Sequence, residues 1–443
     1  MTTHDVVAIG CGPFNLGLAA LASTVPDVDV VVLEARPELR WHSGVMFPDA
    51  LLQVSFLADL VTLVDPAHPL SFLAYLRDAD RLYPFYVRER FHPTRREYED
   101  YLRWAAARLP VRFSHGVSSV EWAGDRFVVS GPGFSVEARH LVLGVGTAPH
   151  VPPALAGLGD RLVHSSDYLH RDVSRERVTV VGSGQSGAEV VLDLLRRNLS
   201  DGRPAVSWLT RTPVFAPLDY TRLVLEMTTP AYVRHFHSLP QDRRDALRAE
   251  QWRHYRAISS ETLDELHDLL YRREWEHGLA PVELRPGVSV VSSVSSSSGS
   301  SVSSSSGSSA VSSSGSGAEV VLECLHRDTG RTFRHVTDLV VAATGYRQAP
   351  TPFLAPLEPF VRRDDQGRYV VALDHSIEID PAIGGRVFVA NADLHSHGVA
   401  APDLGIGAVR NATILNAVAG REVYPLPAHT AYTSFTAPGE TVD

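Results

Sequence analysis

Two glycine-rich turns in this chain have the residue types and spacing that could hold dinucleotide phosphates. The first reads Gly10-Cys-Gly12-Pro13-Phe-Asn15, and an acidic residue, Glu34, follows 24 residues after Gly10. Glycine at the first position permits a tight turn, and glycine at the second lets the backbone approach a pyrophosphate. Glu34 is placed to accept hydrogen bonds from ribose hydroxyls. This pattern predicts a dinucleotide site rather than a purely structural turn.

The second turn reads Gly182-Ser-Gly184-Gln185-Ser186-Gly187, which is the complete Gly-x-Gly-x-x-Gly pattern. The strand expected after its helix ends in Arg211 instead of an acid. A carboxylate there would repel a 2′-phosphate, whereas a guanidinium can bind one through two hydrogen bonds. The second cofactor is therefore expected to be NADPH rather than NADH.

Both turns lie where an apolar stretch ends and a helix-forming stretch begins. Residues 5–9 precede the first turn and 15–21 follow it, while 178–181 and 188–196 flank the second. Strand, turn, helix and strand in this order form a βαβ unit, and such units imply parallel strands with helical crossovers. The sequence therefore predicts an α/β fold with two Rossmann-like dinucleotide-binding domains.

Two more apolar stretches end in small residues where the chain could pass close to a bound cofactor. Residues 141–144 run into 145–149, and residues 339–343 run into Thr344-Gly345-Tyr346. Small residues at strand ends are typical of places where the backbone approaches another group. We assign the second of these segments to a cofactor site.

The remaining sequence suggests how the domains divide. Residues 217–280 are polar and helix-forming, which predicts a small helical substrate domain. The expected division assigns 1–165 and 335–443 to the domain of the first glycine turn, and 166–216 and 281–334 to the NADPH domain of the second turn. Residues 292–317 are mostly serine and glycine, so a flexible surface loop is expected there.

Composition excludes several classes of function. The chain has 443 residues, 44% of them hydrophobic, and a formal charge of −10, so no basic surface for nucleic acid or anionic membranes is expected. Its two cysteines, Cys11 and Cys324, cannot form a disulfide framework, a redox dithiol or a paired metal site. Neither a signal peptide nor a membrane-spanning run is present, so a cytoplasmic enzyme without a metal centre is expected.

Several segments together resemble the class B flavin monooxygenases that N-hydroxylate ornithine, lysine and diamines for hydroxamate siderophores. The closest similarity within that family is to the diamine hydroxylases of desferrioxamine-type pathways, through residues 217–228 and 402–408. The segments that carry the family resemblance are 10–16, 41–44, 52–61, 101–105, 182–189, 343–346 and 397–398.

The resemblance implies FAD at the first turn, NADPH at the second and an amine pocket beneath the helical domain. It places His42 and Gln53 near the flavin and nicotinamide as the catalytic candidates, and adds Trp41 and Leu404 to the cofactor site. In that family NADPH reduces the flavin, and O2 then hydroxylates a neutral amine while the protein excludes water. Without the resemblance, His42 would be interpreted as a surface histidine and Gln53 as a polar loop cap.

Departures from the amino-acid-specific members point to the substrate. Ala58 stands where ornithine and lysine hydroxylases have a lysine that pairs with the substrate carboxylate. Leu225 and His254 replace asparagines of the ornithine-specific enzymes, and Gly405 replaces a serine. A carboxylate buried there would lack a partner, so a diamine such as cadaverine or putrescine is expected. Glu226 is the candidate partner for the second ammonium.

Other interpretations remain open at this stage. An L-lysine N6-hydroxylase could bind its carboxylate through Arg222, and an L-ornithine N5-hydroxylase is a related alternative. A disulfide reductase would share the paired βαβ units but needs a dithiol, and an NADP-binding module would lack flavin. No general base is identified. The resemblance also implies a homo-oligomer, either a tetramer or a dimer.

Overall fold

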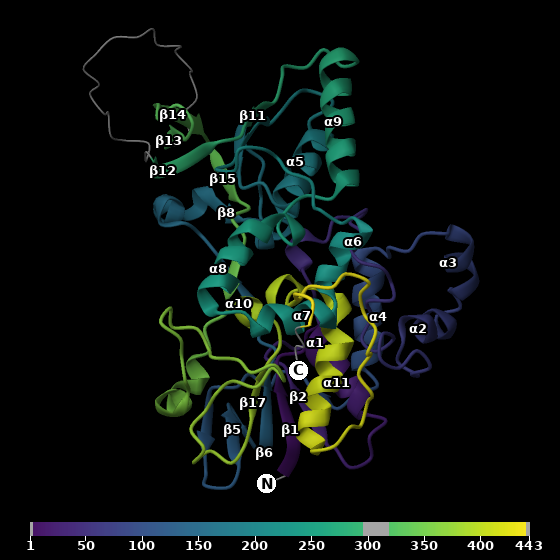
Figure 1. Ribbon diagram of the computed structural model, residues 1–443. Helices are drawn as coiled ribbons and strands as arrows, with labels where there is room; N and C mark the ends of the chain where they lie inside the picture. Colours follow the sequence, from purple (N-terminus) through teal and green to yellow (C-terminus); the bar gives the residue numbers. More distant parts are fainter. Residues whose placement is uncertain (1–2, 296–318, 440–443) are drawn as a thin grey trace.

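The computed structural model describes residues 3–295 and 319–439 (Figure 1). Their largest sheet has seven strands in the order β3-β2-β1-β6-β5-β4, with β17 paired to β6. All neighbours pair in parallel except β4 with β5 and β5 with β6. The strands are β1 (Thr3–Ile9), β2 (Val30–Leu33), β3 (Val111–Arg112), β4 (Ser119–Trp122), β5 (Phe127–Gly131), β6 (Phe134–Leu143) and β17 (Val387–Val389).

The central strands of this sheet are apolar on both sides because both faces are covered. Val6 and Ala8 of β1 face a layer that contains helices α1 (Pro13–Ala22), α4 (Arg95–Ala106) and α11 (Gly407–Ala419). Val7 and Ile9 face the opposite layer, which includes β4, β5 and apolar residues between 353 and 383. Continuous apolar strands are typical of parallel sheets buried on both faces.

The second sheet has five parallel strands in the order β11-β10-β9-β15-β8. We expected the segments that form β8 and β15 in the first domain, but β15 pairs with β9 and β8 pairs with β15. An apolar strand that ends in small residues looks alike in either sheet, so the sequence did not distinguish them. The strands are β8 (Leu162–His164), β9 (Arg177–Val181), β10 (Ala205–Leu209), β11 (Glu283–Arg285) and β15 (Leu339–Ala342).

The chain passes between the two sheets along β7 (Thr147–Pro149) and β16 (Tyr346–Gln348). These two short strands pair antiparallel as a ribbon. Each follows a glycine with a left-handed backbone, Gly146 at φ +71° and Gly345 at φ +82°. The carbonyl of Gly345 also accepts a hydrogen bond from the His150 backbone N–H at 2.9 Å. Both crossings therefore share one narrow connection.

Helices cover the second sheet and the space between the sheets (Figure 1). Helix α5 (Gln185–Arg197) follows the second glycine turn and packs against α9 (Ser260–Trp275). The segment 217–280, expected to be helical, contains α9 together with α6 (Arg222–Leu225), α7 (Pro230–Ser238) and α8 (Gln241–Glu250). No helix in the described part of the chain combines the length and apolar character needed to span a bilayer.

A three-stranded antiparallel sheet carries the start of the serine- and glycine-rich stretch. It is formed by β12 (Val288–Ser295), β13 (Val320–His326) and β14 (Thr332–Thr337). Ser292 to Ser295, which we expected in the loop, continue β12 and pair with β13. The rest of the expected loop, from 296 to 317, lies outside the described residues.

Candidate functional site

The first glycine turn is held tightly on one side and is open on the other. Gly10 has φ +97°, and a Cβ atom at this position would lie 2.4 Å from the carbonyl oxygen of Gly144. The Asn15 side-chain amide donates to the carbonyls of Ile9 and Gly10, at 3.1 and 2.8 Å. Nothing lies within 4 Å of a Cβ built on Gly12, the residue that begins α1. The open face at a helix N-terminus fits a pyrophosphate.

The acid expected to bind ribose lies directly against this turn. One carboxylate oxygen of Glu34 accepts from the backbone N–H of Cys11 at 2.8 Å, and the other accepts from Arg36 N–H at 2.9 Å. Burial and the neighbouring Glu34 charge raise the pKa of the Cys11 thiol to about 12. Cys11 therefore remains an uncharged thiol at neutral pH, and Glu34 lies where a ribose would follow the pyrophosphate.

Leu404 and Pro13 are brought together from opposite ends of the chain. Both line a small cavity of about 10 Å³ at the N-terminal ends of α1 and α11. Asp59 also lines it, and burial raises the pKa of this carboxyl. The structure thus places two of the expected flavin-site residues beside the first glycine turn.

The second turn repeats the construction of the first. Gly182 has φ +118°, and a Cβ there would lie 2.1 Å from the carbonyl oxygen of Ala343. A Cβ on Gly187 would lie 2.4 Å from the Gly182 carbonyl oxygen, while Gly184 begins α5. In each sheet, therefore, the first glycine of the turn lies against the residue that directly follows the neighbouring parallel strand. Ser186 lies in the first turn of α5.

The segment after β15 is tied to the crossing ribbon. The Thr344 hydroxyl donates to the His150 carbonyl. The ring of Tyr346 packs edge-on against His164, with 5.3 Å between centroids, and burial raises the pKa of Tyr346. These contacts hold Thr344 and Tyr346, the two neighbours of Gly345, in place.

Arg211 follows β10 and is exposed at the carboxyl end of the second sheet. A second arginine, Arg327, donates to the Arg211 carbonyl at 3.2 Å. Among the residues of 3–295 and 319–439, neither guanidinium is in an ion pair. Sequence reasoning missed Arg327 because it comes 116 residues later, in the turn after β13. The Arg327 guanidinium therefore lies beside the backbone of Arg211, the residue that we expect to bind a 2′-phosphate.

A hydrogen-bond network joins Gln53 to the second turn and to the helical segment. Gln53 Nε2 donates to Gln185 Oε1 at 3.3 Å, and the Ser259 backbone N–H donates to the same oxygen at 2.9 Å. Gln185 Nε2 in turn donates to Glu189 at 2.8 Å and to Thr262 at 3.0 Å. The network connects a loop beside the first sheet, helix α5 and the start of α9.

An ion pair extends this network between the two halves. The Arg95 guanidinium donates to both oxygens of Glu189, at 2.8 and 2.6 Å, and also to the Val45 carbonyl at 3.1 Å. The side chains are only 12% and 9% exposed. Arg95 begins α4, and Glu189 lies in α5. A bidentate pair in this surrounding holds the two helices in a defined relative position.

Gln53 and Gln185 line a large cavity with a volume of about 590 Å³. Its walls are the 47–53 segment, the exposed side of α5, residues 217–221 and the start of α9. Tyr220 also lines it, and burial raises the pKa of this phenol to about 12. The cavity therefore lies where the two halves and the helical segment meet.

His42 lies next to this region in an uncommon backbone conformation, at φ +53°. Its ring meets that of Trp41 edge-on, with 4.5 Å between centroids. Surrounding protein and the charges of Arg95 and Arg36 lower the pKa of His42 to about 4. The imidazole is therefore neutral at pH 7, although His42 is exposed at the surface of the described chain.

The five substrate candidates do not gather at the large cavity, since none of them lines it. Ala58 is buried, and Leu225 and His254 are half-buried. His254 Nδ1 is buried and has no hydrogen-bond partner in the described residues. The Gly405 N–H donates to Asp403 at 2.6 Å, and a Cβ on Gly405 would lie 2.9 Å from that oxygen. A serine at this position would crowd Asp403.

Glu226 has a different set of partners from the one expected. Its carboxylate accepts hydrogen bonds from the backbone N–H groups of Tyr432 and Thr433, at 3.0 and 2.9 Å, and from the Thr433 hydroxyl. These donors lower the pKa of Glu226. In this structure Glu226 therefore holds the C-terminal segment, a role that the local sequence did not indicate.

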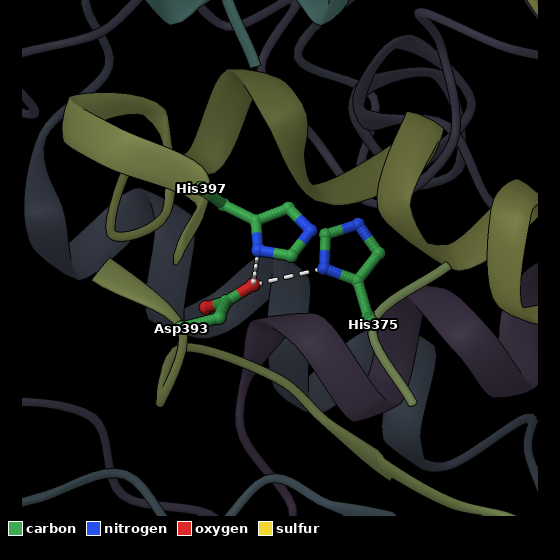
Figure 2. Close-up of side chains that lie close together, drawn as sticks. All are labelled: His375, Asp393 and His397. Carbon is green, nitrogen blue, oxygen red and sulfur yellow. Dashed lines mark hydrogen bonds and ion pairs between the residues drawn. The ribbon is translucent and has the colours of Figure 1, made fainter. Parts of the chain in front are cut away.

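A buried cluster that sequence reasoning missed lies near the N-terminus of α11. Figure 2 shows both histidine rings directed at Asp393, with His375 Nδ1 at 2.8 Å and His397 Nδ1 at 3.7 Å from the same oxygen. The Arg410 guanidinium lies 3.9 Å from that oxygen. Burial opposes ionisation of Asp393, but Arg410 and His375 hold its pKa below the usual value.

The geometry of this cluster does not suit a metal ion. The rings of His375 and His397 stack at 4.1 Å with 23° between their planes. A coordinating nitrogen directs its lone pair within the ring plane, so two nearly parallel stacked rings do not converge on one ion. Arg410 already supplies the positive charge. The cluster is better described as a buried ion pair flanked by two neutral histidines, whose pKa values burial lowers.

The sequence matches a known protein family and related enzymes over most of its length. The model of the L-lysine 6-monooxygenase/L-ornithine 5-monooxygenase family matches residues 2–348. A putrescine N-hydroxylase from Shewanella oneidensis is 35% identical and is aligned over 98% of this chain and 84% of its own length.

Solved structures agree over nearly the whole chain. The FAD-bound cadaverine monooxygenase of the desferrioxamine pathway of Erwinia amylovora is 36% identical, with complete coverage of both chains and a TM-score of 0.90. An ornithine N-hydroxylase from Kutzneria sp. 744, solved with reduced FAD, NADP+ and L-ornithine, is 28% identical. It covers 94% of this chain and 99% of its own, with a TM-score of 0.82. The chain belongs to the L-lysine 6-monooxygenase/L-ornithine 5-monooxygenase family of flavin-dependent N-hydroxylating monooxygenases.

Proposed function

We propose that this enzyme hydroxylates one terminal amine of an aliphatic diamine, cadaverine or putrescine, for hydroxamate siderophore biosynthesis. The observation that carries the proposal is the buried methyl group of Ala58, at the position where the amino-acid-specific enzymes have a carboxylate-binding lysine. All 41 residues in the lysine and arginine count are arginines, so no lysine elsewhere in the chain can replace it. Arg222, the alternative carboxylate partner, is exposed on α6.

Two relatives support the diamine assignment by their own substrates. The Shewanella relative is named for putrescine, and the Erwinia structure for cadaverine. Both substrates are diamines without a carboxylate. An amino acid bound in the same pocket would bury a carboxylate, which costs several kcal/mol unless a cation pairs with it.

The residues of this chain are proposed to bind the two cofactors and to exclude water, while the cofactors supply the redox chemistry. FAD, when bound, supplies the redox and oxygen chemistry after reduction by NADPH. The N-termini of α1 and α5, capped by Gly12 and Gly184, would hold the pyrophosphate groups of the two nucleotides. Gln53 and Gln185 link the two cofactor regions through a direct hydrogen bond at the large cavity. The protein's main tasks are therefore to position both nucleotides and to keep water from the reacting amine.

The amine must be neutral to react. Its ordinary pKa near 10.4 means that deprotonation at pH 7 costs about 4–5 kcal/mol, at about 1.36 kcal/mol per pKa unit. Removing water from the ammonium lowers that cost. His42 is neutral at this pH, so it adds no positive charge that would repel the substrate.

A product-based assay tests the proposal. Purified enzyme with FAD and NADPH is offered putrescine, cadaverine, L-lysine and L-ornithine, and the hydroxylamine product is measured beside NADPH oxidation. A diamine is expected to give the highest kcat/KM with most NADPH oxidation coupled to product. A higher kcat/KM for lysine or ornithine would contradict the diamine assignment, while NADPH oxidation without any hydroxylamine would contradict the activity.

We also propose that the enzyme acts in the cytoplasm as a homo-oligomer. Both cysteines, Cys11 and Cys324, are buried and free, which suits a reducing compartment. Sedimentation of the purified protein tests the assembly, because a single species at the monomer mass would contradict it.

A further inference from the structure

An unusually apolar surface lies on a helical hairpin at the side of the first half. The hairpin consists of α2 (Phe72–Asp78) and α3 (Leu82–Arg88), and it projects from the molecule in Figure 1. None of the residues of α3 is buried. Tyr83, Tyr86 and Phe91 are 79%, 71% and 64% exposed, and Val87 lies between them in the sequence with 71% exposure. We call these four residues the α3 patch.

The exposed area of the α3 patch matches that of the largest apolar patch on a typical monomer, which is often a functional surface. An aromatic side chain presents about 150–250 Å², so its three rings alone expose on the order of 400 Å². Leu73 and Leu82 add further exposed apolar area beside them. The largest apolar patch of a typical monomer is about 300–600 Å², and a stable interface buries about 800 Å² on each partner. The rings supply about half of that requirement.

The hairpin that carries the patch is firmly packed on its inner side. The ring of Phe85 lies 5.5 Å from that of Phe56 and 5.7 Å from that of Phe72, both edge-on. Phe91 stacks on Phe56 at 5.8 Å. The exposed side chains therefore extend from a preformed support, so little ordering is needed when a partner binds.

Charges at the two ends of α3 indicate which partner fits. Asp80 lies before the helix and Arg90 after it, and both are exposed. Within residues 3–295 and 319–439, neither side chain has an ion pair or a hydrogen bond. The two residues lie equally far, five positions each, from Phe85 at the middle of the helix. An antiparallel copy of α3 related by a two-fold axis would place each acid opposite the other copy's arginine.

We propose that the α3 patch binds the α3 patch of a second copy of this chain, with the two helices antiparallel across a two-fold axis. Tyr83, Tyr86, Val87 and Phe91 form the buried centre. Asp80 pairs with Arg90 of the partner subunit, and the symmetry repeats this pair at the other end. Phe56 lies in the segment between Gln53 and Ala58, so the interface also supports the loop that carries both residues.

Sedimentation velocity of the full-length, FAD-loaded protein over a concentration series tests the central contact. Tyr83→Ala combined with Tyr86→Ala is expected to raise the dissociation constant of the dimer by roughly 10-fold or more. The matched control is Tyr271→Ala on α9, which removes an aromatic ring with 59% exposure far from the hairpin. Unchanged association in the double variant, or equal weakening by the control, would overturn the proposal.

Charge substitutions at Arg90 and Asp80 test whether the two α3 helices pack antiparallel. Arg90→Glu should weaken association, because the new carboxylate would face Asp80 of the partner. Adding Asp80→Asn, which tolerates the left-handed backbone at φ +54°, removes that repulsion, so the double variant should associate about 3-fold or more tightly than Arg90→Glu alone. Within one chain the seven residues of α3, about 10 Å of helix, lie between the two positions, so their mutual interaction is weakened by screening at about 0.1 M salt. A double variant no tighter than Arg90→Glu would contradict the antiparallel arrangement.

Discussion

We expect the preference for NADPH to depend most directly on Arg211. Replacing it by alanine removes the charge beside the expected 2′-phosphate, so we expect Arg211→Ala to raise the KM for NADPH about 10-fold or more. The KM for NADH should change little because NADH has no 2′-phosphate. Steady-state kinetics with both nucleotides measure the difference. Arg327→Ala is the companion variant and should shift the same preference by a smaller factor. Equal effects on both nucleotides would show that Arg211 has only a structural role.

We expect the choice between diamine and amino acid to depend on Ala58. Ala58→Lys should favour lysine and ornithine, because the new ammonium pairs with a carboxylate and repels the second ammonium of a diamine. Two effects of roughly 1–2 kcal/mol each would change the ratio of kcat/KM values about 30- to 1,000-fold. Ala58→Met, similar in length but uncharged, serves as the control. The same shift in both variants would mean that size rather than charge sets the preference.

Single residues also show where sequence reasoning ends. Gly10, Gly12 and Glu34 could be assigned because their spacing is local and their chemistry follows from the turn itself. We expected Glu226 to bind the second ammonium, but in the structure its carboxylate accepts hydrogen bonds from Tyr432 and Thr433. Contacts between residues some 200 positions apart leave no local signature, so the sequence could not reveal them.

At the level of elements, the two glycines of the first turn should respond differently to alanine. Gly10→Ala forces a side chain into a left-handed backbone and within 2.4 Å of a carbonyl, so the fold should be destabilised. Gly12→Ala meets open space and should fold normally while losing FAD affinity, because its methyl enters the phosphate cradle. Thermal unfolding of the apoprotein and FAD titration separate the two effects. Equal loss of apoprotein stability in both variants would contradict this assignment.

The ion pair between α4 and α5 should be important for stability. Glu189→Gln leaves Arg95 largely buried without its counter-charge, so we expect a loss of about 2–4 kcal/mol in the free energy of unfolding. The exposed pair of Arg272 and Glu276 is the control, and Glu276→Gln should cost at most about 0.5 kcal/mol. Denaturant titration of both variants measures the contrast. Similar small losses would mean that the helices are positioned by other contacts.

The elements themselves were largely predictable, but their partners were not. The strand before each glycine turn and the helix after it follow from apolar runs and turn chemistry, and both are present as β1 with α1 and β9 with α5. The membership of β8 and β15 in the second sheet could not be predicted, because strand pairing depends on long-range contacts. The same limit applies to β12, whose serine-rich end pairs with β13.

For the whole molecule, buried histidines should make stability fall on mild acidification. Burial lowers the pKa of His164, His237, His375, His395 and His397 from the ordinary 6.5. Below about pH 6.5 the unfolded chain therefore binds more protons than the folded one, and the free energy of unfolding decreases as pH falls. Denaturant titrations between about pH 7.5 and about pH 5.5 should show this decrease. A constant or rising stability over that interval would contradict the assignment of neutral histidines.

The ribbon of β7 and β16 has a consequence for how the molecule can move. Because both chain crossings run side by side and begin at left-handed glycines, Gly146 and Gly345, the halves are joined as by a single hinge. Nothing lies within 4 Å of a Cβ built on either glycine, so no side chain packs against this side of the two crossings. Away from the ribbon, the Arg95–Glu189 and Gln53–Gln185 contacts also join the two halves. A change in the angle between the two halves would therefore have to bend the ribbon and break these side-chain contacts together.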